Sequence, residues 1–360
     1  MGEKGATLAS LFDPQRNALN ALRLLFALTV IVSHSWALGG FGDEPQAGGI
    51  TLGTWSVLGF FGISGYLITR SRLSGRSAYR YYRARALRIL PAFLVCLVFV
   101  AFVLAPLAAM LDESASWSPS EALTYVLRNA ALYPPQISQE GIEGTLQGVP
   151  YVGMWNGSLW TLFWEGACYI AVGVAVSMLP RPALTKVAVV TVAAGALVAL
   201  AAQTQTVSLP DLAGRVLPLV VAFLAGAVLF LYSDRLRVSA LSVTAAIILL
   251  LASVILGVAQ SVGVLPFVFL VMVVGSVLPL VSVGAKYDIS YGVYIYAWPV
   301  QQVVFVLFGN DVELPGVIAL SIAGTVPLAF LSCILIEQPV MRWGRGARRS
   351  SIAPLASIPE

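Results

Sequence analysis

Charged residues are scarce in this sequence. Asp, Glu, Lys and Arg make up only 11% of the 360 residues, whereas 58% of the residues are hydrophobic and the mean hydropathy is +0.86. A soluble domain of this length needs a more polar surface, so the composition predicts an integral membrane protein that contacts the lipid bilayer. The net charge of +4 then reflects anchoring at the cytoplasmic face, and we expect no nucleic-acid partner.

Cysteine and histidine are also rare. The three cysteines, Cys96, Cys168 and Cys333, all fall in apolar runs, and no two of them form a CxxC pair. His34 is the only histidine. A structural zinc site needs several such ligands, and a disulfide needs an oxidising compartment as well as a pair. We therefore expect neither a metal cofactor nor a structural disulfide.

Ten long apolar runs predict ten membrane-spanning segments. They cover residues 18–38, 50–70, 87–110, 158–180, 185–203, 212–232, 239–258, 262–282, 287–308 and 314–337. The runs lack the alternation of polar and apolar residues that is typical of membrane β-barrels. The predicted fold class is therefore an all-α integral membrane protein, a bundle of about ten transmembrane helices.

The basic residues predict the orientation of this bundle. All Lys and Arg residues except Arg128 and Arg215 fall on one side of the ten predicted spans, together with both termini. Cytoplasmic loops carry the excess of Lys and Arg, so both termini are predicted to be cytoplasmic. Residues 1–345 are expected to form one transmembrane domain. Residues 346–360 are basic and contain Ser and Pro, for which we expect a mobile tail.

His34 lies within the first apolar run, eleven residues after Arg23. Eleven residues make about three turns of helix, so the two side chains share a face and lie roughly 16 Å apart along the axis. Ionisable groups inside a membrane span are costly and indicate a functional site by default. We therefore expect the activity to lie along the line from Arg23, near the inner surface, to His34, beyond mid-depth.

A basic segment leads into the third span from the cytoplasmic side. It contains Arg80, Arg83, Arg85 and Arg88, with tyrosines interleaved. Such side chains anchor a helix at the membrane surface, but arginine also binds phosphate oxygens with paired hydrogen bonds. The segment alone leaves two ligands open, which are anionic lipid head groups and a phosphorylated cytosolic molecule. Glu337, at the inner end of the last span, is expected to pair with an arginine of this segment.

The fourth span opens with a polar stripe. Ser158, Thr161 and Glu165 are spaced so that they share one helix face. Glu165 lies about two turns below the outer surface and His34 about one turn below it, so we expect the two to meet. A carboxylate beside an imidazole fixes its tautomer and raises its basicity. The alternative is a polar pair that only holds two spans together.

Two other spans carry periodic stripes. Gly59, Gly62 and Gly65 line one face of the second span, which either lets another helix approach closely or leaves space for a ligand beside the first span. The ninth span carries an aromatic stripe that includes Tyr291 and Tyr294. Tyrosines of membrane proteins gather at the interfaces. A stripe through the full depth therefore indicates either a polar-lined cavity or core packing.

Taken in order, these motifs resemble those of the membrane acyltransferase-3 family, bacterial proteins that O-acylate sugars and related acceptors. Arg23 and His34 are similar to the family's Arg-x10-His motif, and Arg85 and Arg88 to its Arg-x-x-Arg motif. The segments GFFGISGYLI, SLWTLFWE, DISYGVYIYAWP and IEQP resemble further family motifs in the same order. The resemblance covers nearly the whole chain.

Two positions depart from the family pattern. Gly166 stands where many members have a second Glu, and Ala297 stands where many have His before Trp-Pro or Phe-Pro. Any contribution of those two groups to catalysis is therefore not expected in this chain.

The resemblance implies a membrane O-acyltransferase that uses cytosolic acyl-coenzyme A, with acetyl-coenzyme A as the expected donor. The expected catalytic residues are His34, Glu165 and Arg23. The expected coenzyme ligands are Arg85, Arg88, Arg83 and Arg80. The residues expected at the acceptor are Ser158, Trp160, Tyr291 and Tyr294. His34 would act as a general base on the acceptor hydroxyl or as a covalent acyl relay.

The resemblance also implies an acceptor and a location. The expected acceptor is a sugar hydroxyl of a cell-surface, exopolysaccharide or lipid-linked glycan, and the expected location is the bacterial inner membrane. Two alternatives stay open on the sequence, a transporter or flippase of a lipid-linked sugar and an acyltransferase for a secondary-metabolite scaffold. The chain does not show the paired, interrupted helices of many transporters. The sequence does not set the acyl chain length or the oligomeric state.

Overall fold

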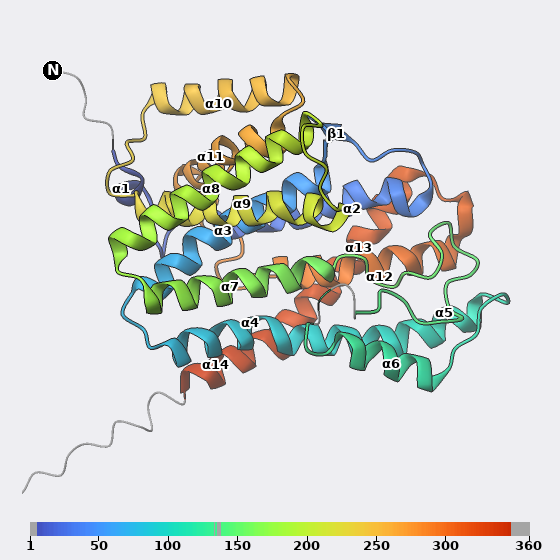
Figure 1. The fold of residues 1–360 in the computed structure, drawn as a ribbon. Coiled ribbons are helices and arrows are strands. Elements are labelled where there is room, and N and C mark those ends of the chain that lie inside the picture. The colour runs from blue at the N-terminus through green and yellow to red at the C-terminus, as the bar shows by residue number, and fades with distance from the viewer. Residues whose placement is uncertain (1–5, 133, 135–137, 347–360) are drawn as a thin grey trace, which may run out of the picture.

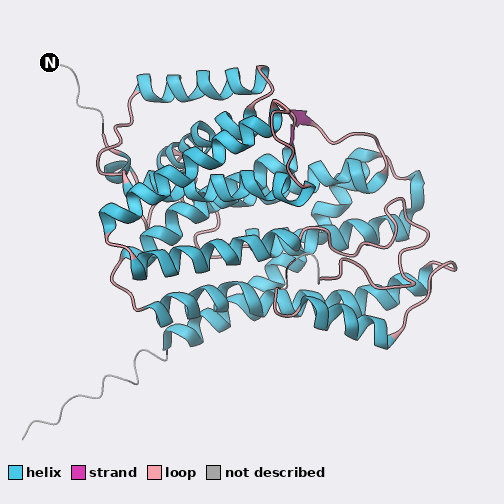
Figure 2. Ribbon diagram, in the orientation of Figure 1, coloured by secondary structure: helices cyan, strands magenta, loops and turns pink. Residues whose placement is uncertain are grey.

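The fold is described from a computed structural model for residues 6–132, 134 and 138–346. The predicted tail, residues 346–360, lies outside this part except for Gly346. Long helices run side by side through the molecule (Figures 1 and 2). They are α2 (Leu19–Gly39), α3 (Leu52–Leu73), α4 (Ala78–Phe99), α7 (Trp160–Met178), α8 (Arg181–Gln203), α9 (Asp211–Leu231), α11 (Val264–Val277), α12 (Ser290–Phe308) and α13 (Leu314–Ser332).

Shorter elements connect or extend these helices. They are α1 (Leu8–Leu11), α5 (Ala105–Leu111), α6 (Pro119–Asn129), α10 (Ala240–Ile255), α14 (Gln338–Gly346), the π-helices η1 (Val100–Leu104), η2 (Ala259–Gly263) and η4 (Cys333–Glu337), and the 3-10 helix η3 (Gly309–Asp311). The strands of the described residues are β1 (Gln46–Ala47) and β2 (Ile50–Thr51), a small antiparallel pair in the loop between α2 and α3.

The predicted all-α membrane bundle is confirmed. Among the described residues, nine helices are long and apolar enough to cross a membrane. The seventh predicted span corresponds to α10, which has only 16 residues and is about 24 Å long, below the roughly 30 Å of a hydrocarbon core. It lies beside α11 and connects α9 to η2 (Figure 1).

The basic segment is helical over most of its length. Ser77 caps the start of α4, and α4, η1 and α5 together form one span of 34 residues from Ala78 to Leu111. The third helix therefore begins nine residues before the predicted start at residue 87, and the connection between the second and third predicted spans, residues 71–86, shrinks to residues 74–77. A Ser N-cap and the good helix-forming propensity of Arg and Ala explain this extension.

The glycine face of α3 is filled by neighbouring helices. A Cβ added at Gly65 would lie 1.8 Å from the carbonyl oxygen of Phe223 in α9, and one added at Gly59 would lie 2.4 Å from the ring of Phe26 in α2. These contacts support the helix-crossing interpretation of the stripe. The space beside the first span that we considered for a ligand is therefore occupied by protein on this face.

Candidate active site

Two cavities follow one another along α3, α7 and α12. The inner cavity, of about 150 Å³, lies among the halves of α2, α3, α4 and α12 that the basic residues predict to be cytoplasmic. The outer cavity, of about 1120 Å³, lies among the opposite ends of α2, α3, α7 and α9. Val57, Thr161 and Tyr294 line both cavities, so these residues separate them.

Three arginines line the inner cavity, namely the expected coenzyme ligands Arg85 and Arg88 and the expected catalytic residue Arg23. Arg23 comes from α2, and Arg85 and Arg88 come from the early turns of α4. Arg85 and Arg23 form no ion pair with other described residues, and Nε of Arg85 is buried without a hydrogen-bond partner there. An unpaired buried guanidinium nitrogen is costly, and a phosphate oxygen is a suitable partner for it. The cavity residues thus fit a polyanionic ligand.

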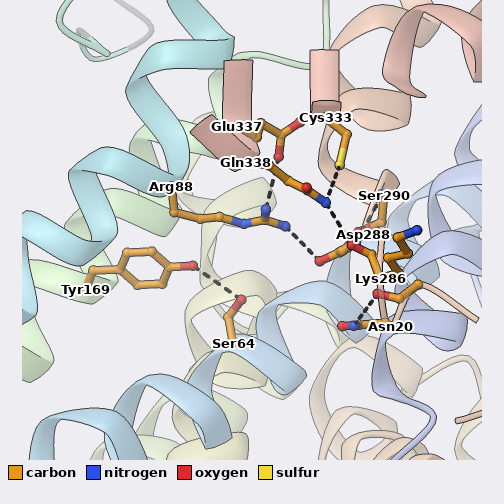
Figure 3. A network of polar contacts seen from close by, with 11 residues as sticks. Asn20, Ser64, Arg88, Tyr169, Lys286, Asp288, Ser290, Cys333, Glu337 and Gln338 are labelled. Carbon is orange, nitrogen blue, oxygen red and sulfur yellow. Dashed lines mark hydrogen bonds and ion pairs between the residues drawn. The ribbon is translucent and has the colours of Figure 1, made fainter. Parts of the chain in front are cut away.

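Arg88 differs from the other two arginines because its guanidinium is already paired. Its Nη2 lies 2.7 Å from Asp288 and its Nη1 lies 3.0 Å from Glu337 (Figure 3). Both partners come from the C-terminal part of the chain, so Arg88 links α4 to the start of α12 and to η4. The expected pairing of Glu337 with an arginine of the basic segment is present in this contact.

Arg80 and Arg83 line neither cavity. Arg80 is exposed in the first turn of α4, where its backbone N–H donates to the Ser77 cap. Arg83 donates from Nη1 to the carbonyl of Gly344 at 3.1 Å and lies over the ring of Trp343. These contacts fasten α4 to the C-terminal helix α14. Arg80 and Arg83, which were predicted to bind the coenzyme, therefore contact neither cavity.

Glu165 lies at the inner cavity, among hydroxyl groups. Its Oε1 accepts hydrogen bonds from Ser64 at 2.9 Å and from Tyr169 at 2.5 Å, and Figure 3 shows the side chains of Ser64 and Tyr169 pointing toward one another. We expected this carboxylate to meet His34, but His34 lines the outer cavity and Glu165 the inner one. The depths of the two residues, counted along their spans, were not accurate enough. Glu165 lies one turn beyond Thr161, on the side of the inner cavity.

His34 contacts a different carboxylate, that of Glu44. Its Nδ1 lies 3.6 Å from Oε1 of Glu44 and makes no hydrogen bond with the described residues. The other oxygen of Glu44 accepts a hydrogen bond from Ser33, whose Oγ in turn accepts from the backbone N–H of Gly53 at 2.9 Å. The ring of Trp298 packs edge-on against the imidazole, with centroids 5.0 Å apart. The imidazole of His34 thus has Glu44 and the ring of Trp298 as neighbours at the outer cavity.

The environment of Glu44 favours its ionised form. Burial alone raises the pKa of the carboxyl group. The nearby His34 and the hydrogen bond from Ser33 together lower the pKa by more than burial raises it, so that the pKa lies below its ordinary value of 4.5. A charged carboxylate beside Nδ1 favours a proton on that nitrogen and leaves Nε2 available as a base. Sequence reasoning missed Glu44. The available signal was an acidic pair, Asp43 and Glu44, in the short loop directly after the helix of His34.

The four residues predicted at the acceptor divide between the two cavities. Ser158 and Trp160 line the outer cavity, Tyr291 lines the inner one, and Tyr294 lines both. Trp160 lies under the guanidinium of Arg215, 4.6 Å from ring centroid to Cζ. Tyr291 donates from its hydroxyl to the carbonyl of Ile89 at 2.9 Å. The aromatic stripe of α12 therefore lines cavities rather than serving only as packing.

Comparison with known proteins agrees with this arrangement. A family model described as an acyltransferase domain matches residues 16–334. The chain is 30% identical to an O-acetyl transferase of Shigella phage Sf6 over 80% of this chain and 85% of that protein. It is 26% identical to Nodulation protein 10 of Rhizobium leguminosarum bv. viciae over 94% of this chain and 97% of that protein. No solved structure matches the chain.

The match covers the Arg-x10-His segment, both cavities and nearly all of the bundle. The resemblance inferred from the motifs is thereby confirmed, and the spans make the protein a multi-pass membrane protein. The chain belongs to the acyltransferase-3 family and is a membrane O-acyltransferase.

Proposed function

We propose that the protein transfers an acetyl group from cytosolic acetyl-coenzyme A to a hydroxyl group of a glycan presented at the outer face of the bacterial inner membrane. The observation that carries this proposal is the pair of cavities along one axis. One contains three arginines near the cytoplasmic ends of the helices, and the other contains the single histidine near the opposite ends. A donor and an acceptor can thus reach one site from the two sides of the membrane.

The donor belongs to the inner cavity in this proposal. Coenzyme A carries a pyrophosphate and a 3′-phosphate, and arginine binds such groups with charge-assisted hydrogen bonds. Arg85 and Arg23 have guanidinium groups that the described residues leave without ion pairs, and Arg88 holds the wall through Asp288 and Glu337. The pantetheine arm then extends toward His34, over a distance of about 16 Å along α2.

His34 carries the chemistry. As a general base, Nε2 takes the proton of the acceptor hydroxyl while the oxygen attacks the thioester carbonyl. The C–S bond breaks, the C–O bond of the ester forms, and the proton passes from the imidazolium to the departing thiolate. As a relay, Nε2 itself attacks the thioester, the C–S bond breaks and the coenzyme leaves as the thiolate. The acceptor oxygen then attacks the acyl-imidazolium, the C–N bond breaks as the ester C–O bond forms, and the hydroxyl proton ends on the thiolate. In both routes the carboxylate of Glu44, 3.6 Å from Nδ1, stabilises the positive charge that the ring acquires.

Glu165 acts on the donor side in this proposal. Its carboxylate fixes the hydroxyl groups of Ser64 and Tyr169 in the wall of the inner cavity. It thereby shapes the passage taken by the pantetheine arm and does not touch the imidazole.

The acceptor belongs to the outer cavity, which offers aromatic and polar side chains together. Trp298, Trp160 and Tyr151 line it, with Gln205 and Gln260 among the polar groups. Such a mixture is typical of small-molecule and sugar sites. The name of the phage relative, O-acetyl transferase, supports acetyl as the transferred group.

Labelled donor tests the proposal. Purified protein in lipid nanodiscs is incubated with [14C]acetyl-coenzyme A and with membrane glycans extracted from the bacterium that produces the protein. Free coenzyme A and labelled glycan are both measured. The wild-type protein is expected to produce both, and His34→Ala to abolish both while it still binds coenzyme A. A labelled protein after incubation with donor alone indicates the relay. Coenzyme A release by His34→Ala at the wild-type rate would refute the assignment of His34.

A further inference from the structure

Three side chains lie at the boundary between the two cavities. Val57 projects from α3, Thr161 from α7 and Tyr294 from α12, and each lines both cavities. If the donor binds at Arg85 and reacts at His34, as proposed above, its thioester passes between these three residues. The dimensions of this opening therefore affect which acyl groups reach the histidine.

The tyrosine of the opening is held in place from several directions. Its hydroxyl group forms a hydrogen bond with Oγ1 of Thr161 at 2.6 Å and donates to the carbonyl of Ser158 at 3.2 Å. Its ring packs edge-on against Phe60, with centroids 5.8 Å apart. Tyr294 is only 7% exposed and Thr161 only 5%. Packed side chains of this kind resist displacement, so the tyrosine side of the opening has a defined position.

Val57 is the third residue that lines both cavities, and its side chain has a fixed shape as well. A valine in a helix keeps essentially one side-chain rotamer. Its two methyl groups therefore stand at a constant position relative to the ring of Tyr294. Removing them widens the opening without touching the hydrogen bonds of Tyr294 and Thr161.

The width of the acyl group matters at this opening more than its length. A linear chain is no wider than the pantetheine arm that follows it, and the outer cavity of about 1120 Å³ has space beyond the opening. A branch next to the carbonyl adds width at the thioester itself. We propose, on the basis of the function proposed above, that Val57, Thr161 and Tyr294 form a width filter that admits unbranched acyl groups and excludes acyl groups branched at the carbon next to the carbonyl.

Butyryl- and isobutyryl-coenzyme A test this filter, because their acyl groups contain the same four carbons and differ in branching. Release of coenzyme A by the protein in nanodiscs, with host membrane glycans present, gives kcat/KM for each donor. The wild-type protein is expected to prefer butyryl about tenfold or more, within the range that one misplaced carbon produces in a tight site. Val57→Ala is expected to reduce this preference at least about fivefold, and Val57→Ile to increase it.

Val190→Ala is the matched control. It removes the same two methyl groups from a position of α8 that is 65% exposed, and the preference should stay at the wild-type value. Equal rates for both donors in the wild type, or an unchanged preference in both Val57 variants, would overturn the filter. Failure of the wild-type protein to release coenzyme A from acetyl-coenzyme A is a different result, because it would refute the proposed donor itself. If Val57→Ala does not fold, the preference of Val57→Ile for butyryl over isobutyryl donors decides the test by itself.

Discussion

An oxygen of Glu44 lies 3.6 Å from Nδ1 of His34, and both residues belong to one short stretch of chain in which α2 ends and turns back toward α3. Gly40 ends α2 in the left-handed conformation, with φ of 65°, which glycine adopts without steric cost. The turn brings the following loop over the end of its own helix. His34 therefore receives its neighbouring carboxylate locally, and not from α7 as the depths counted along the spans suggested.

Glu44→Gln should lower kcat by about tenfold or more with little change in the dissociation constant of coenzyme A, because it removes the charge that supports the imidazolium and keeps the shape. Coenzyme A release and calorimetric binding measure the two quantities. Glu143→Gln, at an exposed position of the outer loop that lines neither cavity, is the control. Glu165→Gln should instead alter donor binding. A normal kcat in Glu44→Gln would remove Glu44 from the mechanism.

The lowered pKa of Glu44 has a consequence for stability against pH. A carboxyl group whose pKa is lower in the folded protein stabilises the fold above its ordinary pKa of 4.5, and the stabilisation is lost as the pH falls through the lowered value. The difference in Tm between the wild type and Glu44→Gln should therefore persist at pH 5 and disappear in more acidic solution. Thermal unfolding in detergent over this range measures it. A difference that vanishes already above pH 5 would contradict the prediction.

Arg85 and Arg88 should respond differently to the same substitution. Arg85→Ala removes a guanidinium that has no ion pair in the described part of the chain, so the dissociation constant of coenzyme A should rise about tenfold or more with a small change in Tm. Arg88→Ala leaves Asp288 and Glu337 without their partner, and this should destabilise the protein by about 3–5 kcal/mol. Calorimetric titration and thermal unfolding separate the two effects. Equal effects of both variants on Tm would contradict the distinction.

Gly65→Ala should destabilise the bundle strongly, because a Cβ there would lie 1.8 Å from a backbone carbonyl of α9. Backbone cannot yield as a side-chain tip does, so we expect a loss of at least about 1–3 kcal/mol. Gly166→Ala is the control, since no atom lies within 4 Å of an added Cβ at that position, and it should be neutral or stabilising. Thermal unfolding of both variants in detergent is the measurement. Equal Tm values would show that α3 and α9 separate easily.

Much of the bundle could be predicted from the sequence because lipid imposes simple rules. Nine of the ten predicted spans correspond to helices long enough to cross a membrane. Apolar runs of about 20 residues match the thickness of the hydrocarbon core and are rare in soluble domains. The position at which α4 starts was predicted too late in the sequence, because a hydropathy profile does not distinguish an Arg-rich helical turn from a loop. In fact Ser77 caps a helix there, and Arg83 and Arg88 are fixed by contacts with the C-terminal part of the chain.

The candidate site was predicted in its parts but not in its pairing. Arg23, Arg85 and Arg88 do line one cavity and His34 another. Depth along a span can be estimated from residue counts, but the rotation and tilt of two helices cannot. Glu165 was therefore placed beside His34, although Thr161 and Tyr294 lie between the two cavities. The partner of His34 lies in a loop, and loop paths depend on turns such as the one at Gly40 that hydropathy does not reveal.

The hydrogen bond between Thr161 and Tyr294 also concerns the ionic barrier of the membrane. A protein with cavities reaching inward from both faces risks a continuous column of water, and such a column would conduct protons and dissipate the gradient across the membrane. A buried tyrosine hydrogen-bonded to a buried threonine lies where the two cavities share their lining, and there it would interrupt such a column. Under the proposed function, a thioester on one side of the bilayer could then drive chemistry on the other side without a leak of ions.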